Sequence, residues 1–369
     1  MGELWIVLAV SCGLAFLSEK YTFAWNGRPS KFLNTGIVVL LIIYLSLFAG
    51  LRTGYNDTYT YMSSYKAMQP FPDILTGFSW KLGDNPGFVL LNSLMKAAGF
   101  SAQTFVLFYS TLFVASAVSF LKRYSGSFTL SIFLFICAHG YLLSLAAMKQ
   151  CASIAIGIMA ISFMLKQKWI RFAAIILLAA TFHPYILLFL LIPILRFKPW
   201  TARTWMLLAV TLGTGLFLPQ VIGTVIDAAA LLGDGYDANN FMGEGVNIFR
   251  VLVASVPVFL TLVFRQSISD KRIAEQRNTF VNCSFVYASI MFVGLFGTAN
   301  YFGRLAGYFI IFPAVVLPSI IKGLSAKDRH WLEILMILCY LAFFYYGNAI
   351  NGSFEDEFSR MTLWRYLRG

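Results

Sequence analysis

Four ionisable side chains stand where long apolar runs of this sequence begin, end or break. Arg52, Lys149 and Arg304 each lie at the edge of such a run, and His183 precedes Pro184 in the middle of another. Arg binds a phosphate group through two parallel hydrogen bonds, whereas Lys acts as a point charge. If the apolar runs cross a membrane, these cations lie near its surface. There they suit the phosphate or pyrophosphate of a lipid-linked ligand.

His183 and Asp57 are the two candidates for a general base that takes a proton from an attacking hydroxyl. The ordinary pKa of His is about 6.5 and that of Asp is about 3.9, so His183 suits neutral pH better. Asp57 could instead position an acceptor hydroxyl, orient Arg52 or cap a helix that begins at Thr58. Simpler roles are open for the cations too, because Arg and Lys at helix ends commonly reach toward lipid headgroups.

The elements that must position these side chains are membrane-spanning helices. The chain has 369 residues, of which 59% are hydrophobic and 12% charged, and its mean hydropathy is +0.74. An average soluble domain has about 25% charged residues, so a soluble, disordered or disulfide-stapled protein is excluded. The five cysteines form no Cys-X-X-Cys pair, and no nucleotide-binding or metalloprotease motif occurs. We therefore predict an all-α membrane protein without a metal or cofactor.

We expect one helical domain, residues 1–369, with about 12 transmembrane helices, within a range of roughly 11–14. The run Trp169–Leu195 is interrupted at His183-Pro184 and has basic residues at both ends, which favours a hairpin that enters and leaves on one side. Gly87–Gly99 is too short to span and is expected at the membrane surface. The other runs are Leu4–Leu17, Leu33–Leu51, Ala102–Leu121, Phe128–Met148, Cys151–Leu165, Thr204–Gln220, Ile248–Phe264, Thr279–Gly297, Leu305–Ile321 and Trp331–Tyr346.

Basic residues set the orientation of these spans. With twelve spans, 18 of the 28 Lys and Arg residues fall in the six connections on one side, which the positive-inside rule assigns to the cytoplasm. Both chain ends, the loops at about 52–101 and 220–247, and the tail 347–369 are then external. The net charge of +12 is thus explained by topology rather than by nucleic-acid binding. Arg52, Lys149 and Arg304 are exceptions on the external side, which favours a shared anionic ligand.

The candidate residues also occur in an order that resembles a known family. The series is Arg52, Gly54, Asp57 and Tyr61; Gly87-Phe88; Lys149-Gln150 before Ala152; Ala179 to His183; and Arg304 with Tyr308. Over about residues 50–325 it resembles the EpsG family of bacterial exopolysaccharide proteins, which is similar to the Wzy-type polysaccharide polymerases. Lys149-Gln150 departs from the usual Arg-Gln, so the charge is kept and the bidentate fork is lost. Residues 84–88 are also only an approximate match.

The resemblance implies a membrane glycosyltransferase of GT-C-like architecture at the outer, periplasmic face of the bacterial plasma membrane. It would join undecaprenyl-pyrophosphate-linked oligosaccharide repeat units into exopolysaccharide, capsule or O-antigen, with no metal or nucleotide sugar. Its partners would be the lipid-linked donor and acceptor, membrane lipids and chain-length regulators or export proteins. With His183 or Asp57 as the catalytic base, the candidate substrate-binding residues are Arg52, Tyr61, Lys149, Gln150, Arg304 and Tyr308, and more weakly Tyr236, Asp237 and Asn300 for sugar contacts.

Other function classes remain open on the sequence alone. A transporter or flippase of lipid-linked sugars would share the basic residues, but it favours charges in mid-helix or paired broken helices in two repeated halves. A glycan transferase resembling the O-antigen ligases would differ chiefly in its acceptor. An acyltransferase would need a second catalytic residue near His183, and a non-enzymatic scaffold leaves the external cations unexplained. Transferase activity on substrate already outside separates an enzyme from a flippase.

Overall fold

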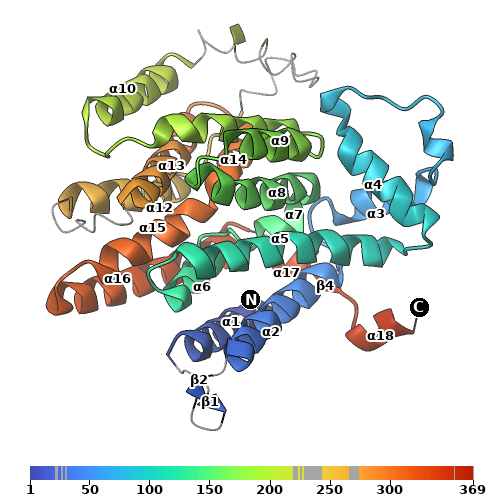
Figure 1. The fold of residues 1–369 in the computed structure, drawn as a ribbon, viewed down its shortest axis with the longest axis horizontal. Coiled ribbons are helices and arrows are strands. Elements are labelled where there is room, and N and C mark those ends of the chain that lie inside the picture. Colours follow the sequence, from blue (N-terminus) through green and yellow to red (C-terminus); the bar gives the residue numbers. More distant parts are fainter. Residues whose placement is uncertain are drawn as a thin grey trace.

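The computed structural model shows a protein built almost entirely of helices (Figure 1). It describes residues 1–20, 24–25, 28–29, 31–218, 223–224, 227, 243–265, 274–352 and 354–368. The elements that precede residue 148 are α1 (Gly2–Lys20), β1 (Ala24–Trp25), β2 (Arg28–Pro29), α2 (Lys31–Gly50), β3 (Arg52–Gly54), α3 (Thr58–Ala67), η1 (Asp73–Leu75), η2 (Leu82–Asp84), α4 (Pro86–Ala97), α5 (Ala102–Tyr124), α6 (Phe128–Cys137) and α7 (Leu143–Ala146).

The remaining elements begin with the helix that carries Lys149. They are α8 (Met148–Leu165), α9 (Trp169–Ala180), the 3₁₀ helix η3 (Pro184–Leu195), α10 (Ala202–Leu216), α12 (Ile248–Val263), α13 (Ala274–Val293), α14 (Ala299–Ala306), η5 (Gly307–Phe309), α15 (Ile311–Lys322), α16 (Ala326–Tyr345), the π-helix η6 (Tyr346–Ile350), α17 (Phe354–Glu357), β4 (Ser359–Arg360) and α18 (Leu363–Leu367).

Four helices among the described residues are long and apolar enough to cross a membrane. They are Gly2–Glu19, Ala102–Tyr124, Met148–Leu165 and Ala326–Ile350, and a fifth span results if α14, η5 and α15, which are bent by 52°, count as one. Several shorter apolar helices lie between them. The prediction of an all-α, multi-pass membrane protein is therefore confirmed. The count of about 12 spans and the GT-C-like architecture stay predictions.

One expected span, Phe128–Met148, is not a continuous helix. Helix α6 ends at Cys137, and His139 then takes a left-handed backbone conformation with φ of 65°. The backbone N–H of Tyr141 donates to the carbonyl oxygen of Phe135 at 2.9 Å and closes the turn. A left-handed non-glycine residue cannot continue a right-handed helix. The run was predicted as one span because its composition is uniformly apolar and a single strained residue leaves no hydropathy signal.

The predicted break before Pro184 is confirmed. Helix α9 ends at Ala180 and η3 begins at Pro184, with His183 in an extended conformation between them. Proline disfavours the helical conformation of the residue before it and has no N–H to donate, so the chain must break there. Gly157 of α8 lies opposite η3, where a Cβ atom would come within 2.7 Å of Ile186. This glycine allows η3 to pack closely on α8 just beyond the break.

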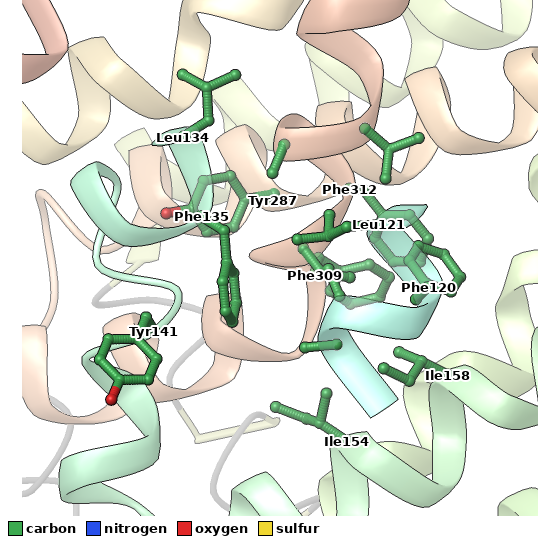
Figure 2. Close-up of a cluster of buried hydrophobic side chains, with 14 of the residues drawn as sticks. Phe120, Leu121, Leu134, Phe135, Tyr141, Ile154, Ile158, Tyr287, Phe309 and Phe312 are labelled. Atoms are coloured by element: carbon green, nitrogen blue, oxygen red, sulfur yellow. The ribbon is translucent and has the colours of Figure 1, made fainter. Parts of the chain in front are cut away.

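The largest cluster of buried side chains joins α5, α6, α8, α13 and α15. Figure 2 labels ten members of this cluster, among them Phe120 of α5, Phe135 of α6 and Phe312 of α15. The ring centroids of Phe120 and Phe312 are 6.0 Å apart in an edge-to-face arrangement. In a lipid environment such contacts stabilise by close packing rather than by removal from water. The cluster therefore holds these helices together, including α8, which carries Lys149 in its first turn.

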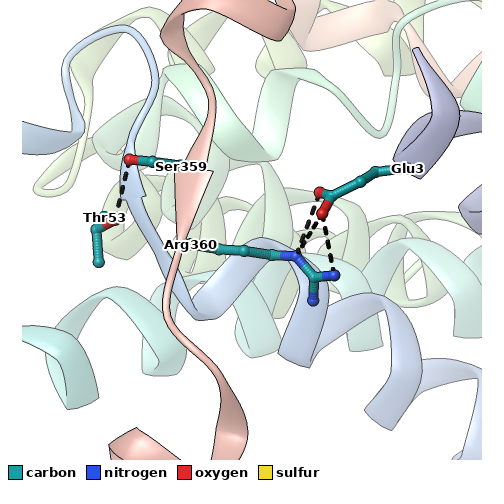
Figure 3. A network of polar contacts seen from close by, with 4 residues as sticks. All are labelled: Glu3, Thr53, Ser359 and Arg360. Carbon is teal, nitrogen blue, oxygen red and sulfur yellow. Dashed lines mark hydrogen bonds and ion pairs between the residues drawn. The ribbon is translucent and has the colours of Figure 1, made fainter.

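The chain beyond α16 returns to the end of the molecule where α1 begins and α2 ends. Strand β4 pairs antiparallel with β3, with Arg52 opposite Arg360. The hydroxyls of Thr53 and Ser359 are 3.0 Å apart, and the Arg360 guanidinium binds the Glu3 carboxylate with nitrogen–oxygen distances of 3.2–3.3 Å (Figure 3). The N-terminal segment, the Arg52 segment and the tail thus lie at one end of the molecule. Which side of a membrane this end faces stays a prediction.

Candidate functional site

Two adjacent cavities contain most of the predicted site residues. The first, about 450 Å³ and here called the Lys149 cavity, is lined by Asp57, Thr60, Tyr61, Ser64, Tyr65, Met68, Phe88, Val89, Asn92, Phe105, Lys149 and Arg304. The second, about 280 Å³ and here called the His183 cavity, is lined by Gln150, His183, Tyr185, Asn300, Tyr301, Arg304, Leu305 and Tyr308. Arg304 lines both cavities. Asp57, Lys149 and His183, which precede Arg304 by 247, 155 and 121 positions, therefore converge on one guanidinium.

The Lys149 cavity places two cations beside a carboxylate. The Arg304 Nη2 is 3.7 Å from the Asp57 Oδ2, and both side chains are substantially exposed, 60% and 45%. The Lys149 Nζ lies 5.7 Å from the centroid of the Phe88 ring, which is the geometry of a cation–π contact. An exposed ion pair contributes about 0–1 kcal/mol. An incoming anion can therefore displace Asp57 from Arg304 at little cost.

Tyr61 connects this cavity to the first turn of α8. A backbone hydrogen bond joins Lys149 to the Tyr61 hydroxyl. The pKa of Tyr61 is raised to about 12, chiefly by burial and then by the charge of Asp57. The phenol therefore stays protonated at neutral pH. It is able to donate a hydrogen bond into the cavity or to the chain that forms its wall.

The His183 cavity contains a half-buried histidine whose ring is held by a second side chain. The His183 Nδ1 is 2.6 Å from the Tyr308 hydroxyl, and Tyr308 is only 1% exposed. The Ser153 hydroxyl fixes the backbone at the break by donating to the carbonyl oxygens of Ala179 at 2.9 Å and of His183 at 3.1 Å. Ser153 of α8 thus fixes the backbone of His183, while Tyr308 orients its imidazole ring.

The electrostatics of this cavity keep His183 neutral. Its pKa is lowered from 6.5 to about 4, chiefly by burial and then by the positive charges of Lys149 and Arg304. A neutral imidazole has one nitrogen that accepts a proton. If Nδ1–H donates to the Tyr308 oxygen, Nε2 carries the free lone pair. At neutral pH the imidazole is then unprotonated and can accept a proton. Its lowered pKa lies near the ordinary Asp value of about 3.9, so the preference for His183 over Asp57 on pKa grounds does not hold for the free protein.

Gln150 holds the two cavities together rather than facing a ligand. Its Nε2 donates to the carbonyl oxygen of Arg304 at 2.6 Å, and its side chain is 3% exposed. A Cβ atom on Gly307 would come within 2.8 Å of the same nitrogen, so a larger residue there would displace the Gln150 amide. Lys149 and Gln150 therefore divide their roles. Lys149 supplies charge, and Gln150 fixes the helix that carries Arg304.

Arg52 lines neither of these two cavities. It is buried, its Nε donates to Thr58 Oγ1 at 2.9 Å, and its Nη1 donates to the Ala49 carbonyl at 2.6 Å and to Ser110 Oγ at 2.9 Å. Burial lowers its pKa to about 10, which still leaves it charged at neutral pH. These bonds tie the end of α2, the start of α3 and α5 together. Arg52 is placed to position Asp57, and its predicted contact with pyrophosphate stays a prediction.

The remaining sequence candidates fall in three places. Asp57 occupies the N-cap position of α3, as one reading of the sequence expected, but its side chain makes no capping hydrogen bond and pairs with Arg304 instead. Asn300 lines the His183 cavity. Tyr236 and Asp237 lie outside the described residues. In the part of the chain that is described, no group of three or more metal-ligating side chains gathers.

The sequence marked Phe88 of α4 only as a member of the ordered motif series, without a role at the site, and did not single out Asn92. Phe88 lies under the Lys149 ammonium, and Asn92 accepts a hydrogen bond from the Tyr109 hydroxyl at 2.7 Å while lining the same cavity. Phe88, Val89 and Asn92 follow helical spacing on one face of α4. That spacing was the available signal. Only the fold shows that this face meets Lys149.

Gly87 joins two of the motifs that are distant in sequence. Its N–H donates to the carbonyl oxygen of Thr181 at 2.9 Å, so the start of α4 sits directly on the break before His183. A Cβ atom at Gly87 would come within 2.1 Å of the Thr181 hydroxyl. The glycine is therefore required by close packing between α4 and the end of α9.

We expect Gly87→Ala to lower kcat/KM for the reaction proposed below by up to about 10²-fold, because a displacement of about 1 Å at a positioning element has effects of that size. The added methyl group must push α4 and Phe88 away from the His183 segment. Initial rates at equal protein in matched membranes test this. Gly213→Ala is the control, since a Cβ atom there meets nothing within 4 Å. Equal rates for the two variants would contradict the positioning role.

Comparison of the chain with known proteins gives one match, which is to the sequence model of a family. No curated protein and no solved structure matches the chain. The sequence model of the EpsG family, however, matches residues 36–362, which is most of the chain and includes every residue of the two cavities. The resemblance seen in the order of the short motifs is therefore confirmed over a longer range than those motifs cover. The chain belongs to the EpsG family.

Proposed function

We propose that the protein is a metal-independent membrane glycosyltransferase that polymerises undecaprenyl-pyrophosphate-linked oligosaccharide repeat units at the outer face of the bacterial plasma membrane. Membership of the EpsG family supports a polysaccharide-polymerase-like role at the level of the family. The observation that carries the proposal is the position of Arg304, which lines a cavity with Lys149 and a second cavity with His183. Two substrates that react with each other need such neighbouring sites.

In this mechanism the donor pyrophosphate enters the Lys149 cavity. It displaces Asp57 from Arg304 and binds between the Arg304 guanidinium and the Lys149 ammonium. As the bond between the anomeric carbon and the phosphate oxygen breaks, negative charge grows on the leaving pyrophosphate, and the two cations stabilise it. Because these cations are in place before the reaction, little reorganisation is needed in the transition state.

The acceptor sugar occupies the His183 cavity, whose walls include Asn300 for a hydrogen bond and Tyr185 for stacking. The acceptor hydroxyl oxygen attacks the anomeric carbon and forms the new glycosidic bond. Its proton passes to Nε2 of His183, and the imidazolium that results keeps its Nδ1–H bonded to Tyr308. Lipid pyrophosphate leaves, and the proton returns to solvent. Tyr308 is a positioning residue in this scheme, because it acts through the imidazole.

The direct test is polymer formation in proteoliposomes that contain the purified chain and lipid-linked repeat units added from the outside. We expect a ladder of glycans that lengthens with time and remains attached to lipid. Movement of the repeat unit across the bilayer without any new glycosidic bond would instead indicate a flippase. Transfer of a single finished glycan to a different acceptor, with no ladder, would indicate a ligase-like enzyme. Chain-length regulators and export proteins are proposed partners, and omitting them should change product length rather than bond formation.

A further inference from the structure

A third cavity lies between α5 and α8, on a part of the molecule that the reaction does not use. It has a volume of about 650 Å³, and its walls include Phe108, Leu112 and Phe120 of α5 and Met159 and Phe163 of α8. Both helices are candidate membrane spans. Phe108 is 39% exposed and Met159 57% exposed, so the cavity is a groove that opens sideways. In a bilayer such a groove faces lipid chains rather than water.

The groove has a direction relative to the candidate site. Phe105, near the start of α5, lines the Lys149 cavity, and α8 begins with Met148 just before Lys149. The residues of α5 that line the groove run from Phe108 to Tyr124, a length of about 24 Å along the helix axis. The groove therefore extends from near the site toward the opposite end of both helices.

Arg123 stands at that opposite end. It lines the groove, and its guanidinium carbon lies 5.4 Å from the centroid of the Tyr124 ring. None of the four ion pairs found among the described residues includes Arg123. An apolar groove that ends at an exposed guanidinium is complementary to a lipid whose chains fill the groove and whose phosphate reaches the Arg.

We propose that this groove binds an anionic phospholipid of the leaflet opposite the candidate site, with its phosphate on Arg123 and an acyl chain between α5 and α8. Charge complementarity selects this occupant. The tail of a polyprenyl carrier that entered from the site would present an uncharged hydrocarbon end to Arg123 and would leave the cation unused. The proposal does not depend on the reaction proposed above. It follows from the shape of the groove and the position of one charge.

A bound chain would also support the candidate site. Helix association in lipid depends on close packing, so a groove of this size is a gap that a lipid chain must fill. The helices on either side carry Phe105 and Lys149, which face the Lys149 cavity. Removal of the lipid is therefore expected to loosen α5 relative to α8 and to weaken the arrangement of both residues.

Native mass spectrometry of the purified full-length chain in neutral detergent, titrated with phosphatidylglycerol, measures this binding. Arg123→Gln should weaken the apparent affinity about fivefold, as expected for one basic residue near a lipid phosphate. Arg123→Lys should restore most of it. Ser116→Trp, which fills the groove without changing its charge, should remove one bound lipid. Lys327→Gln is the control, because this exposed Lys does not line the groove.

Three results would overturn the proposal. The first is equal affinity of the Arg123→Gln and parent chains for phosphatidylglycerol. The second is equal binding of phosphatidylcholine, which would show that the headgroup charge is not recognised. The third is binding of undecaprenyl phosphate that Ser116→Trp abolishes and Arg123→Gln leaves unchanged, which would assign the groove to the carrier tail. If Ser116→Trp fails to fold, the pair Arg123→Gln and Arg123→Lys still decides the question.

Discussion

We expect the His183→Ala protein to polymerise lipid-linked repeat units about 10²–10⁴-fold more slowly than the parent chain, because a positioned general base contributes a factor of this size. The loss should appear in kcat rather than in donor affinity, since the donor cations remain. Steady-state rates in proteoliposomes measure it. His330→Ala is the matched control, because His330 is exposed on α16 and lines neither cavity.

The pH dependence gives the same prediction a second readout. His183 accepts a proton only while neutral, and its pKa in the free protein is lowered to about 4. The acid limb of kcat/KM should therefore lie near pH 4 rather than near the ordinary 6.5. A bound pyrophosphate offsets the charges of Lys149 and Arg304, so the acid limb of kcat should lie at higher pH. Because the folded pKa is the lower one, stability also falls as the pH drops from 6.5 toward 4.

Two companion variants separate the possible bases. Tyr308→Phe removes one hydrogen bond to His183 and should lower kcat by about fivefold, with a change in the acid limb. Asp57→Asn should act on donor binding, because Asp57 pairs with Arg304. Near-normal kcat in His183→Ala together with inactive Asp57→Asn would assign the base to Asp57. Near-normal activity in both would exclude the base assignment altogether.

The second large effect is expected at Arg304. Arg304→Gln should lower kcat/KM by about 10²–10³-fold, the usual effect of removing one group that stabilises charge in the transition state. Lys149→Gln should also lose activity. Lys149→Arg should retain it or improve it, because Arg keeps the charge, stacks on Phe88 and adds a second hydrogen bond to phosphate.

Arg365→Gln tests whether the activity losses of the Arg304 and Lys149 variants reflect loss of a specific contact in the cavities or loss of general positive charge nearby. Arg365 is an exposed cation of α18 that lines neither cavity. Its removal should leave the rate within about twofold of the parent, since exposed charges at a distance are screened at physiological salt. Equal losses in Arg304→Gln and Arg365→Gln would contradict a specific pyrophosphate site.

Local chemistry explains what could be predicted from the sequence. Pro184 restricts its own neighbour, so the break at His183 was visible without any tertiary information. The family resemblance likewise followed from short motifs in order. The strained backbone at His139 left no trace in the hydropathy of Phe128–Met148, and that span was predicted wrongly as continuous.

Burial explains what could not be predicted at the site. Arg52 and Arg304 both stand at the edges of apolar runs and look equivalent in sequence. One is enclosed by the end of α2, the start of α3 and the middle of α5, and the other is 60% exposed on the wall of two cavities. The direction in which a helix end faces depends on its neighbours. For the same reason the contact of Gly87 with Thr181, 94 positions apart, appears only in the fold.

The pairing of β3 with β4 has a consequence for biosynthesis. Thr53 and Ser359, whose hydroxyls are in contact across this pair, are separated by 306 residues. While the ribosome is still translating the spans between them, the segment that leads from Arg52 to Asp57 has no strand beside it. The end of the molecule that carries the candidate site is completed only after the β4 segment has been made and has paired with β3. A nascent chain at the translocon should therefore be inserted well before it is active.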